Sequence, residues 1–196
     1  MSLNVRGQIL LDDPRGRLLY LDEFWPQGLF GAFDLELRWR QDSIRLFGRP
    51  VPLPRLTAWY GDPGVSYVYS GIRNEPLPWT PQLGSLREAL QRALGTPFNS
   101  VLANRYNSGL QHMSWHADNE PSLGPQPTIA SVSLGAPRPF VLKHKESRER
   151  IKVELADGSL LVMAGRLQDE WLHALPKARR VVEPRINLTF RNVSSP

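Results

Sequence analysis

The sequence His116-Ala117-Asp118 places two potential metal ligands two positions apart. In an extended backbone such residues point to the same side, so an imidazole and a carboxylate can face one point. Two histidines and one carboxylate bind one face of an Fe(II) ion and leave its other positions open. The chain has 4 histidines, and His173 is the best candidate for the second imidazole. These three residues form a candidate metal site, although a His-x-Asp pair alone also arises by chance.

A second polar pattern lies in residues 185–191, with the sequence RINLTFR. Polar and apolar residues alternate there with the period of two that is typical of a half-buried strand. Arg185 and Arg191 share the polar face with Asn187 and Thr189. Arginine is rarely buried without a partner, so two arginines on one strand face require an explanation. A dicarboxylate ligand would supply one.

Length and composition narrow the class of protein. A chain of 196 residues predicts a single domain over 1–196 that can bury a proper core. Its net charge of +5 suits a polyanionic partner, and the absence of cysteine excludes disulfide scaffolds, cysteine–zinc sites and thiol catalysis. No segment has the apolar length of a signal peptide or a membrane span. We therefore expect a cytoplasmic protein with no membrane partner, and a monomer.

Helices and short strands must position the candidate ligands. Residues 83–94 have an apolar stripe at helical spacing, and Gly95 is placed to end that helix. Residues 21–40 are also predicted to be helical. From residue 99 onwards short strands follow one another without helices, and Asp157-Gly158 predicts a hairpin turn. This pattern indicates an α+β, mainly β fold of the sandwich or jelly-roll type.

Residues 44–72 combine basic and aromatic side chains. Arg45, Arg49 and Arg55 alternate with aromatic residues, and prolines at 50, 52 and 54 exclude a helix. Phe47 lies in a predicted turn, where its ring would be exposed. Arginines suit phosphates and aromatic rings suit bases, so the segment fits nucleic-acid contact. The alternative is an ordinary hairpin whose aromatic side chains belong to the core.

Taken together, the motifs resemble the AlkB family of Fe(II)/2-oxoglutarate-dependent dioxygenases. Asn104-Arg-Tyr106, His116-Ala-Asp118, His173 and Arg185–Arg191 follow one another in the order and approximate spacing of that family. The resemblance is strongest to the animal members that repair duplex DNA. It implies a double-stranded β-helix (jelly-roll) catalytic core at about 99–193, flanking helices and a nucleotide-recognition lid at about 45–72. It also implies oxidative removal of alkyl groups from N1-methyladenine and N3-methylcytosine in DNA, with Fe(II), 2-oxoglutarate and O2.

The resemblance also implies roles for individual residues. His116, Asp118 and His173 would bind iron. Arg191 would hold the far carboxylate of 2-oxoglutarate, with the remaining co-substrate contacts made by Asn104, Tyr106, Arg185 and Thr189. The damaged base and its strand would be contacted by Phe47, Arg55, Tyr67, Tyr69, Asn119 and Glu120. Asn119 stands where close relatives have aspartate, which leaves the lesion preference open.

Other classes of function fit these residues less well. A zinc hydrolase also uses two histidines and a carboxylate, but the sequence has no His-Glu-x-x-His and such an enzyme does not need the two strand arginines. A non-catalytic lesion-binding module would show a broken set of metal ligands, whereas this set is intact. The basic and aromatic segment argues against a protein substrate. It does not separate DNA from RNA, so alkylated RNA remains an alternative.

Overall fold

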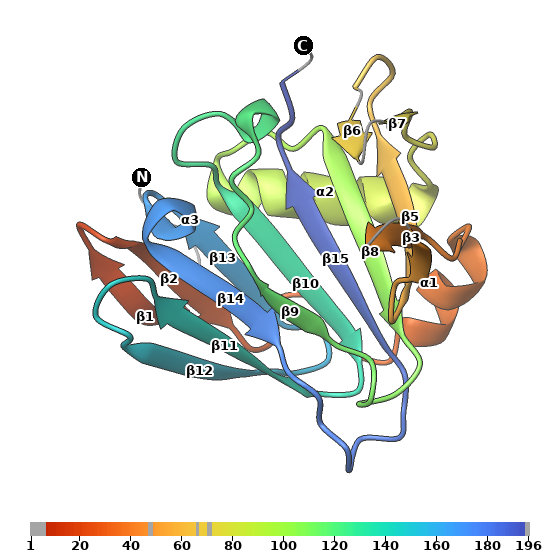
Figure 1. The fold of residues 1–196 in the computed structure, drawn as a ribbon. Helices are drawn as coiled ribbons and strands as arrows, with labels where there is room; N and C mark the ends of the chain where they lie inside the picture. The colour runs from red at the N-terminus through yellow and green to blue at the C-terminus, as the bar shows by residue number, and fades with distance from the viewer. Residues whose placement is uncertain (1–6, 47–48, 66, 70–71, 195–196) are drawn as a thin grey trace.

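The computed structural model describes residues 7–46, 49–65, 67–69 and 72–194. Within these ranges two antiparallel β-sheets face each other, as Figure 1 shows. The larger sheet has the strand order β1 (Gln8–Asp13), β2 (Gly16–Leu21), β13 (Leu160–Ala164), β10 (Ile129–Gly135), β15 (Arg185–Arg191), β8 (Ser100–Tyr106) and β5 (Leu56–Gly61). The smaller sheet has the order β12 (Arg150–Leu155), β11 (Arg138–His144), β14 (Trp171–Leu175) and β9 (Met113–His116). The prediction of a mainly β jelly-roll core is confirmed.

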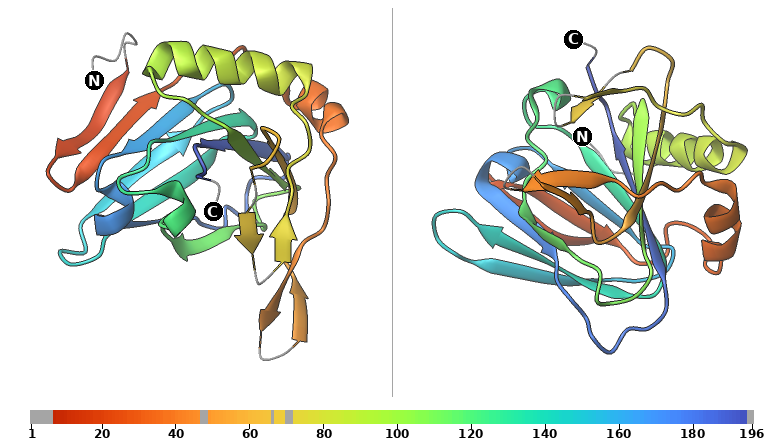
Figure 2. Two further views of the ribbon diagram at one scale, coloured as in Figure 1. Left: turned by 90° about the horizontal axis from the view of Figure 1, so that it is seen from above. Right: turned by 45° about the vertical axis from the view of Figure 1, so that its right-hand side comes forward.

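Two short hairpins stand apart from these sheets. They are formed by β3 (Ser43–Leu46) with β4 (Arg49–Pro52), and by β6 (Tyr67–Tyr69) with β7 (Ile72–Asn74). Figure 2 (left) shows both on the side of the larger sheet that also carries β9. Strand β5, which falls within the predicted lid range, instead pairs with β8 in the larger sheet.

The predicted helix at residues 83–94 is confirmed as α2 (Pro81–Leu94). The Thr80 side chain accepts a hydrogen bond from the N–H of Leu83, and Gly95 ends the helix in the left-handed conformation with φ 61°. The stripe of Leu83, Leu86 and Leu90 is fully buried. Figure 2 (left) shows α2 across the outer face of the larger sheet, so its role is to cover that face.

The predicted helix at residues 21–40 is wrong for most of its length, because only α1 (Phe30–Glu36) is helical there. The N–H groups of Phe24 and Trp25 donate to the carbonyl of Gly158, and the Gly28 N–H donates to a carboxylate oxygen of Asp157. These contacts with a distant turn replace the hydrogen bonds that a helix would need.

The same turn also differs from its prediction. Asp157-Gly158 does not close a hairpin, because β12 belongs to the smaller sheet and β13 to the larger one. The Asp157 carboxylate instead accepts hydrogen bonds from the backbone N–H groups of Gly28 and Gly135. The turn therefore carries the chain from one sheet to the other.

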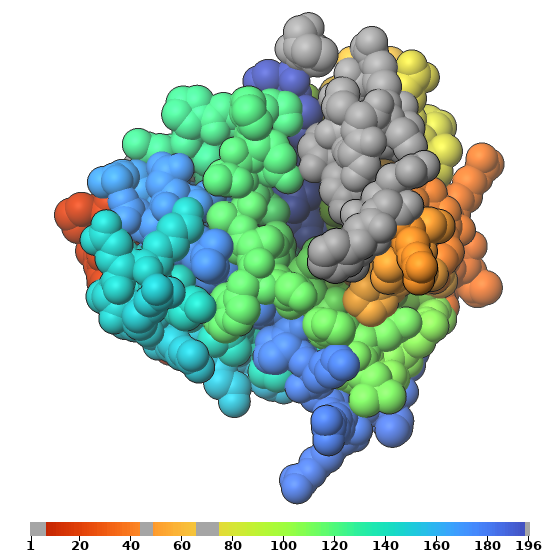
Figure 3. Space-filling model, viewed as in Figure 1, coloured from red at the N-terminus to blue at the C-terminus, as the bar shows by residue number. Residues whose placement is uncertain are grey.

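The space between the sheets is apolar at one end and polar at the other. At the apolar end, Leu18 and Ile129 of the larger sheet meet Leu142 and Trp171 of the smaller one. At the other end a cavity lies between the sheets, and Figure 3 shows the surface hollowed beside the green segment. A short helix, α3 (Leu167–Glu170), precedes β14, and a 3-10 turn, η1 (Pro121–Leu123), follows β9. Within the described parts of the chain, no helix is both long and apolar enough to cross a membrane.

Candidate metal and co-substrate site

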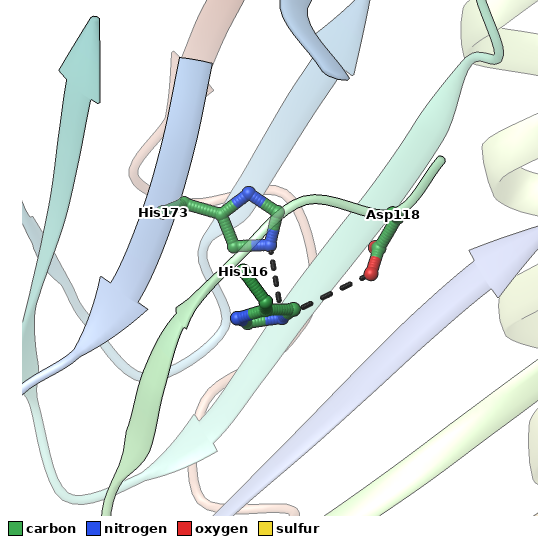
Figure 4. A group of neighbouring side chains, drawn as sticks. All are labelled: His116, Asp118 and His173. Carbon is green, nitrogen blue, oxygen red and sulfur yellow. Dashed lines mark hydrogen bonds and ion pairs between the residues drawn. The ribbon is translucent and has the colours of Figure 1, made fainter. Parts of the chain in front are cut away.

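The structure brings the three predicted metal ligands together from two neighbouring strands. His116 is the last residue of β9 and lies directly opposite His173 of β14, while Asp118 follows two residues later. The two Nε2 atoms are 3.1 Å apart, and His116 Nε2 is 3.9 Å from the nearer Asp118 oxygen. One ligand atom from each residue lies within 4.8 Å of the others, and Figure 4 shows the three groups converging.

The protonation of the imidazoles suits a metal ion. His116 Nδ1 lies 2.8 Å from the carbonyl oxygen of Ser114. Because a carbonyl only accepts, Nδ1 carries the proton and the Nε2 lone pair faces the other ligands. Burial lowers the pKa of His173 to about 3, against the opposing attraction of Asp118. His173 is therefore neutral, the form in which imidazole binds metals.

The Asp118 carboxylate remains ionised although it is buried. Burial alone would raise its pKa, but the positive charge of Arg191 and the hydrogen bond from its guanidinium outweigh burial and lower the pKa to about 2. Arg191 Nη2 donates to Asp118 Oδ2 at 2.7 Å. One carboxylate and two imidazoles form a donor set that fits a divalent metal with open positions.

A prediction for stability follows from the His173 pKa. Its pKa is about 6.5 when unfolded and about 3 when folded, so below pH 6.5 the unfolded chain binds a proton that the folded protein excludes. The metal-free protein should therefore lose stability as the pH falls, by up to about 2 kcal/mol between pH 6.5 and pH 5. Urea unfolding of the wild type and of His173→Asn, both in chelator, measures this loss. Equal pH dependence in the two proteins would contradict it.

A cavity of about 460 Å³ lies beside the three ligands. All five residues predicted to contact 2-oxoglutarate line it: Asn104, Tyr106, Arg185, Thr189 and Arg191. The antiparallel register explains this, because β15 and β8 pair Arg185 with Tyr106 and Asn187 with Asn104. The alternate residues of β15, among them Ile186 and Leu188, face the core under α2. The predicted polar face of residues 185–191 is thus the cavity wall.

Arg185 is a buried cation without a carboxylate partner among the described residues. Its Nη2 donates to Ser133 Oγ at 2.9 Å, its guanidinium lies 5.7 Å from the centre of the Tyr106 ring, and its Nε has no hydrogen-bond acceptor. Burial and the charge of Arg138 lower its pKa to about 10, so it is still charged at neutral pH. A charge buried in this way is costly unless an anion joins it. The site therefore fits a ligand with a carboxylate at this end of the cavity.

A polar network continues along the same wall. Asn187 Nδ2 donates to Ser131 Oγ at 2.7 Å and to the Val132 carbonyl at 3.2 Å, and Thr189 Oγ1 donates to Asn187 Oδ1 at 3.0 Å. Sequence reasoning did not select Ser131 or Ser133 as site residues. The alternation of small polar and apolar residues in β10 could have identified them, because it places both serines on the strand face that is turned towards the cavity.

Arg55 lies inside the cavity rather than on the surface where a phosphate contact would be. It is 8% exposed, and its Nε donates to Asn104 Oδ1 at 2.7 Å. This bond leaves the Asn104 amide N–H groups to other partners. Arg55 therefore connects the segment before β5 with the co-substrate wall.

The remaining predicted substrate residues are placed unevenly. Glu120 lines the cavity, whereas Asn119 is exposed and is not part of the lining. Phe47 lies outside the described residues. Tyr67 and Tyr69 belong to β6, but their side chains also lie outside the described part of the structure.

Comparisons with known proteins agree with this geometry. The family profile of the 2OG-Fe(II) oxygenase superfamily matches residues 20–191. The chain is 42% identical over 159 residues to DNA oxidative demethylase ALKBH2 of Mus musculus. It is 45% identical over 150 residues to alpha-ketoglutarate-dependent dioxygenase alkB homolog 3 of Homo sapiens. These matches confirm the predicted resemblance to AlkB proteins.

The matches span most of this chain but less of the relatives. They cover 77% and 71% of this chain, and 66% and 52% of ALKBH2 and alkB homolog 3. A solved structure, that of OsALKBH1, superposes with a TM-score of 0.66 over 94% of this chain and 100% of its own, at 17% identity. At that identity the similarity shows a shared fold only.

Proposed function

Since this chain belongs to the 2OG-Fe(II) oxygenase superfamily, we propose that it removes alkyl groups oxidatively from the bases of DNA. Fe(II), 2-oxoglutarate and O2 are the cofactor and co-substrates of the superfamily. The names of the relatives, DNA oxidative demethylase ALKBH2 among them, support alkylated DNA as the substrate. The observation that carries the proposal is one cavity lined both by the three candidate ligands and by Arg185, a buried cation with no carboxylate partner among the described residues.

His116, Asp118 and His173 would hold Fe(II). When bound with 2-oxoglutarate and O2, the iron supplies the oxidising chemistry that hydroxylates an N-alkyl carbon, after which formaldehyde leaves from an N-methyl group. The chain keeps both imidazoles aimed at the metal position and keeps the Asp118 carboxylate ionised. Arg191 would keep its hydrogen bond to Asp118 Oδ2 and so orient that carboxylate.

The two arginines of β15 would have different roles. Arg191 contacts a metal ligand, whereas Arg185 lies six residues away on the same strand face. A diacid whose keto-acid end lies at the metal would extend its far carboxylate towards Arg185. We therefore assign the far carboxylate to Arg185 and not, as the sequence resemblance suggested, to Arg191. A guanidinium fork can bind that carboxylate with two charge-assisted hydrogen bonds.

The substrate base would enter from the side of the two small hairpins. N1-methyladenine and N3-methylcytosine are cationic, and the Glu120 carboxylate in the cavity lining would favour them over neutral bases. The hairpins β3–β4 and β6–β7 would form the lid, within the proposed range of about 45–72, and would bring Phe47, Tyr67 and Tyr69 to the base. We also propose that the protein is a monomer and acts in the cytoplasm.

Product analysis tests the reaction and the substrate class together. The protein should release succinate and formaldehyde with DNA that contains N1-methyladenine. Parallel assays with methylated RNA and with a methylated peptide separate the alternative substrates. Lesion binding without either product would favour the non-catalytic alternative, and loss of the methyl group without 2-oxoglutarate would contradict the proposed reaction.

Replacing Phe47 by alanine should reduce repair of duplex DNA much more than repair of a single strand. The proposed role of its ring is to fill the gap left by the flipped base, which only a duplex requires. Stacking of a base on an aromatic ring is worth about 1–3 kcal/mol, so a roughly tenfold or greater loss on the duplex is expected. The same lesion in both substrates and the melting temperature of the variant are measured. Equal losses on both, or the large destabilisation of a core phenylalanine, would favour a core role.

A further inference from the structure

The Gln168 side chain is buried between the metal site and the core. It belongs to α3, is 1% exposed, and accepts a hydrogen bond from the backbone N–H of Asp118 through Oε1 at 2.9 Å. Its Nε2 lies 3.7 Å from the Met163 sulfur. A backbone N–H only donates and a thioether only accepts, so the two partners define one orientation of the amide.

This bond lies where the strand ladder stops. The pairing of β9 with β14 ends at His116, which is opposite His173, and Asp118 follows in a segment without strand structure. Among the described residues, the Asp118 backbone therefore belongs to no strand pairing. Gln168, which precedes β14 by three residues, supplies the acceptor that a further strand residue would have provided.

The backbone that carries Gln168 is itself firmly held. Lys145 Nζ donates to the carbonyls of Gln168 and Asp169, at 3.1 and 2.5 Å. Leu167 is fully buried, and a Cβ on Gly16 would lie 2.8 Å from its backbone nitrogen. The short helix thus packs against the β1–β2 turn, and the Gln168 amide projects from a fixed position.

We propose that Gln168 is a positioning residue for the metal ligand Asp118. It fixes the backbone at Asp118, while Arg191 fixes the carboxylate, so that the carboxylate meets the two imidazoles. Gln168 does not contact the metal position through its own side chain atoms and acts only through Asp118. This inference rests on the metal site proposed above.

Metal titration tests the role without requiring turnover. Gln168→Met keeps the length of the side chain and removes the amide oxygen that accepts the Asp118 N–H. Mn(II) is titrated into the chelator-treated full chain, and free Mn(II) is counted by electron paramagnetic resonance. Loss of a residue that orients a metal ligand lowers metal affinity by about 10–100-fold, and a loss in that range is expected. The melting temperature is measured with and without Mn(II), and the rise caused by the metal should shrink.

The chain offers a matched control in Gln91 of α2. Its Oε1 also accepts a backbone N–H at 2.9 Å, but the donor is Phe98, which is not a candidate metal ligand and does not line the cavity. Gln91→Met should lower the melting temperature and leave the Mn(II) affinity unchanged. A weaker Mn(II) affinity in Gln168→Met alone separates positioning from general destabilisation.

The outcomes distinguish this inference from the metal site itself. The metal site is overturned if the wild type does not bind Mn(II), or if Asp118→Asn binds Mn(II) as tightly as the wild type does. If the wild type binds Mn(II) through Asp118 and Gln168→Met binds it equally well, only the role of Gln168 is overturned. If Gln168→Met does not fold, Gln168→Asn replaces it, since its amide is one methylene too short for the Asp118 N–H. Wild-type affinity in that variant would also overturn the role.

Discussion

Replacing Asp118 by asparagine should abolish turnover and weaken metal binding by two orders of magnitude or more, while the protein stays folded. The variant keeps the shape of the side chain and removes the one negative charge of the ligand set. An amide oxygen is a poorer ligand for a divalent ion than a carboxylate, and the positive charge of Arg191 would then repel the ion. Because the Arg191 side chain is 18% exposed, water can solvate part of its charge, so the loss of stability should be small. Mn(II) titration, succinate release and the melting temperature measure the three effects.

Asp62 provides the control for this substitution. Its carboxylate accepts from Arg87 Nη1 at 2.7 Å, the same distance as in the Arg191–Asp118 pair, but it lies outside the cavity lining. Asp62→Asn removes an ion pair of the same type and should leave metal affinity and turnover unchanged. Retained activity in Asp118→Asn, or equal loss in both variants, would reject Asp118 as a ligand.

The metal ligands and the cavity wall were predictable because they follow local periodicity. Alternation along residues 185–191 places both arginines on one face whatever the rest of the fold does. The spacing of His116 and Asp118 does the same for one imidazole and the carboxylate. What periodicity does not give is the distance between separate strands. That His173 lies opposite His116 depends on the register of β9 with β14, which only the assembled sheet determines.

The parts that sequence reasoning missed depend on contacts between distant residues. The segment at 21–40 has helical periodicity, but the turn at Asp157-Gly158 takes the hydrogen bonds of Trp25 and Gly28. Gln168, next to the metal site, was missed for the same reason. Its amide acts on a backbone N–H fifty residues away along the chain, and no local pattern distinguishes it from any other buried glutamine. The sequence also could not separate the roles of Arg185 and Arg191, because only the structure shows that Arg191 donates a hydrogen bond to Asp118.

Replacing Arg185 by methionine should prevent 2-oxoglutarate binding without destabilising the protein. A buried charge without an opposite charge is unfavourable, so an apolar side chain of similar length should leave the free energy of unfolding unchanged or raise it. The far carboxylate, however, would lose two hydrogen bonds to a charged group, each worth about 1.5–3 kcal/mol. The dissociation constant for 2-oxoglutarate should therefore rise by roughly a hundredfold or more. Calorimetric titration of the Mn(II)-loaded protein and urea unfolding measure the two quantities.

Arg138 is the matched control because it is equally buried but its two terminal nitrogens are bonded to the backbone. Its two terminal nitrogens donate to the carbonyls of Ser108, Gly109, Gln111 and Pro176. Arg138→Met removes the donor to the Gln111 and Pro176 carbonyls, whereas those of Ser108 and Gly109 keep a backbone N–H. It should cost several kcal/mol of stability, since each buried polar group left without a partner costs about 1–3 kcal/mol. The two arginines thus predict opposite results from one substitution. We expect Arg138 to stabilise the fold and Arg185 to bind an anionic ligand. If Arg185→Met were as destabilising as Arg138→Met, Arg185 would be structural and the carboxylate site would have to be sought elsewhere in the cavity. If it were stable and still bound 2-oxoglutarate normally, Arg191 would become the better candidate for the far carboxylate.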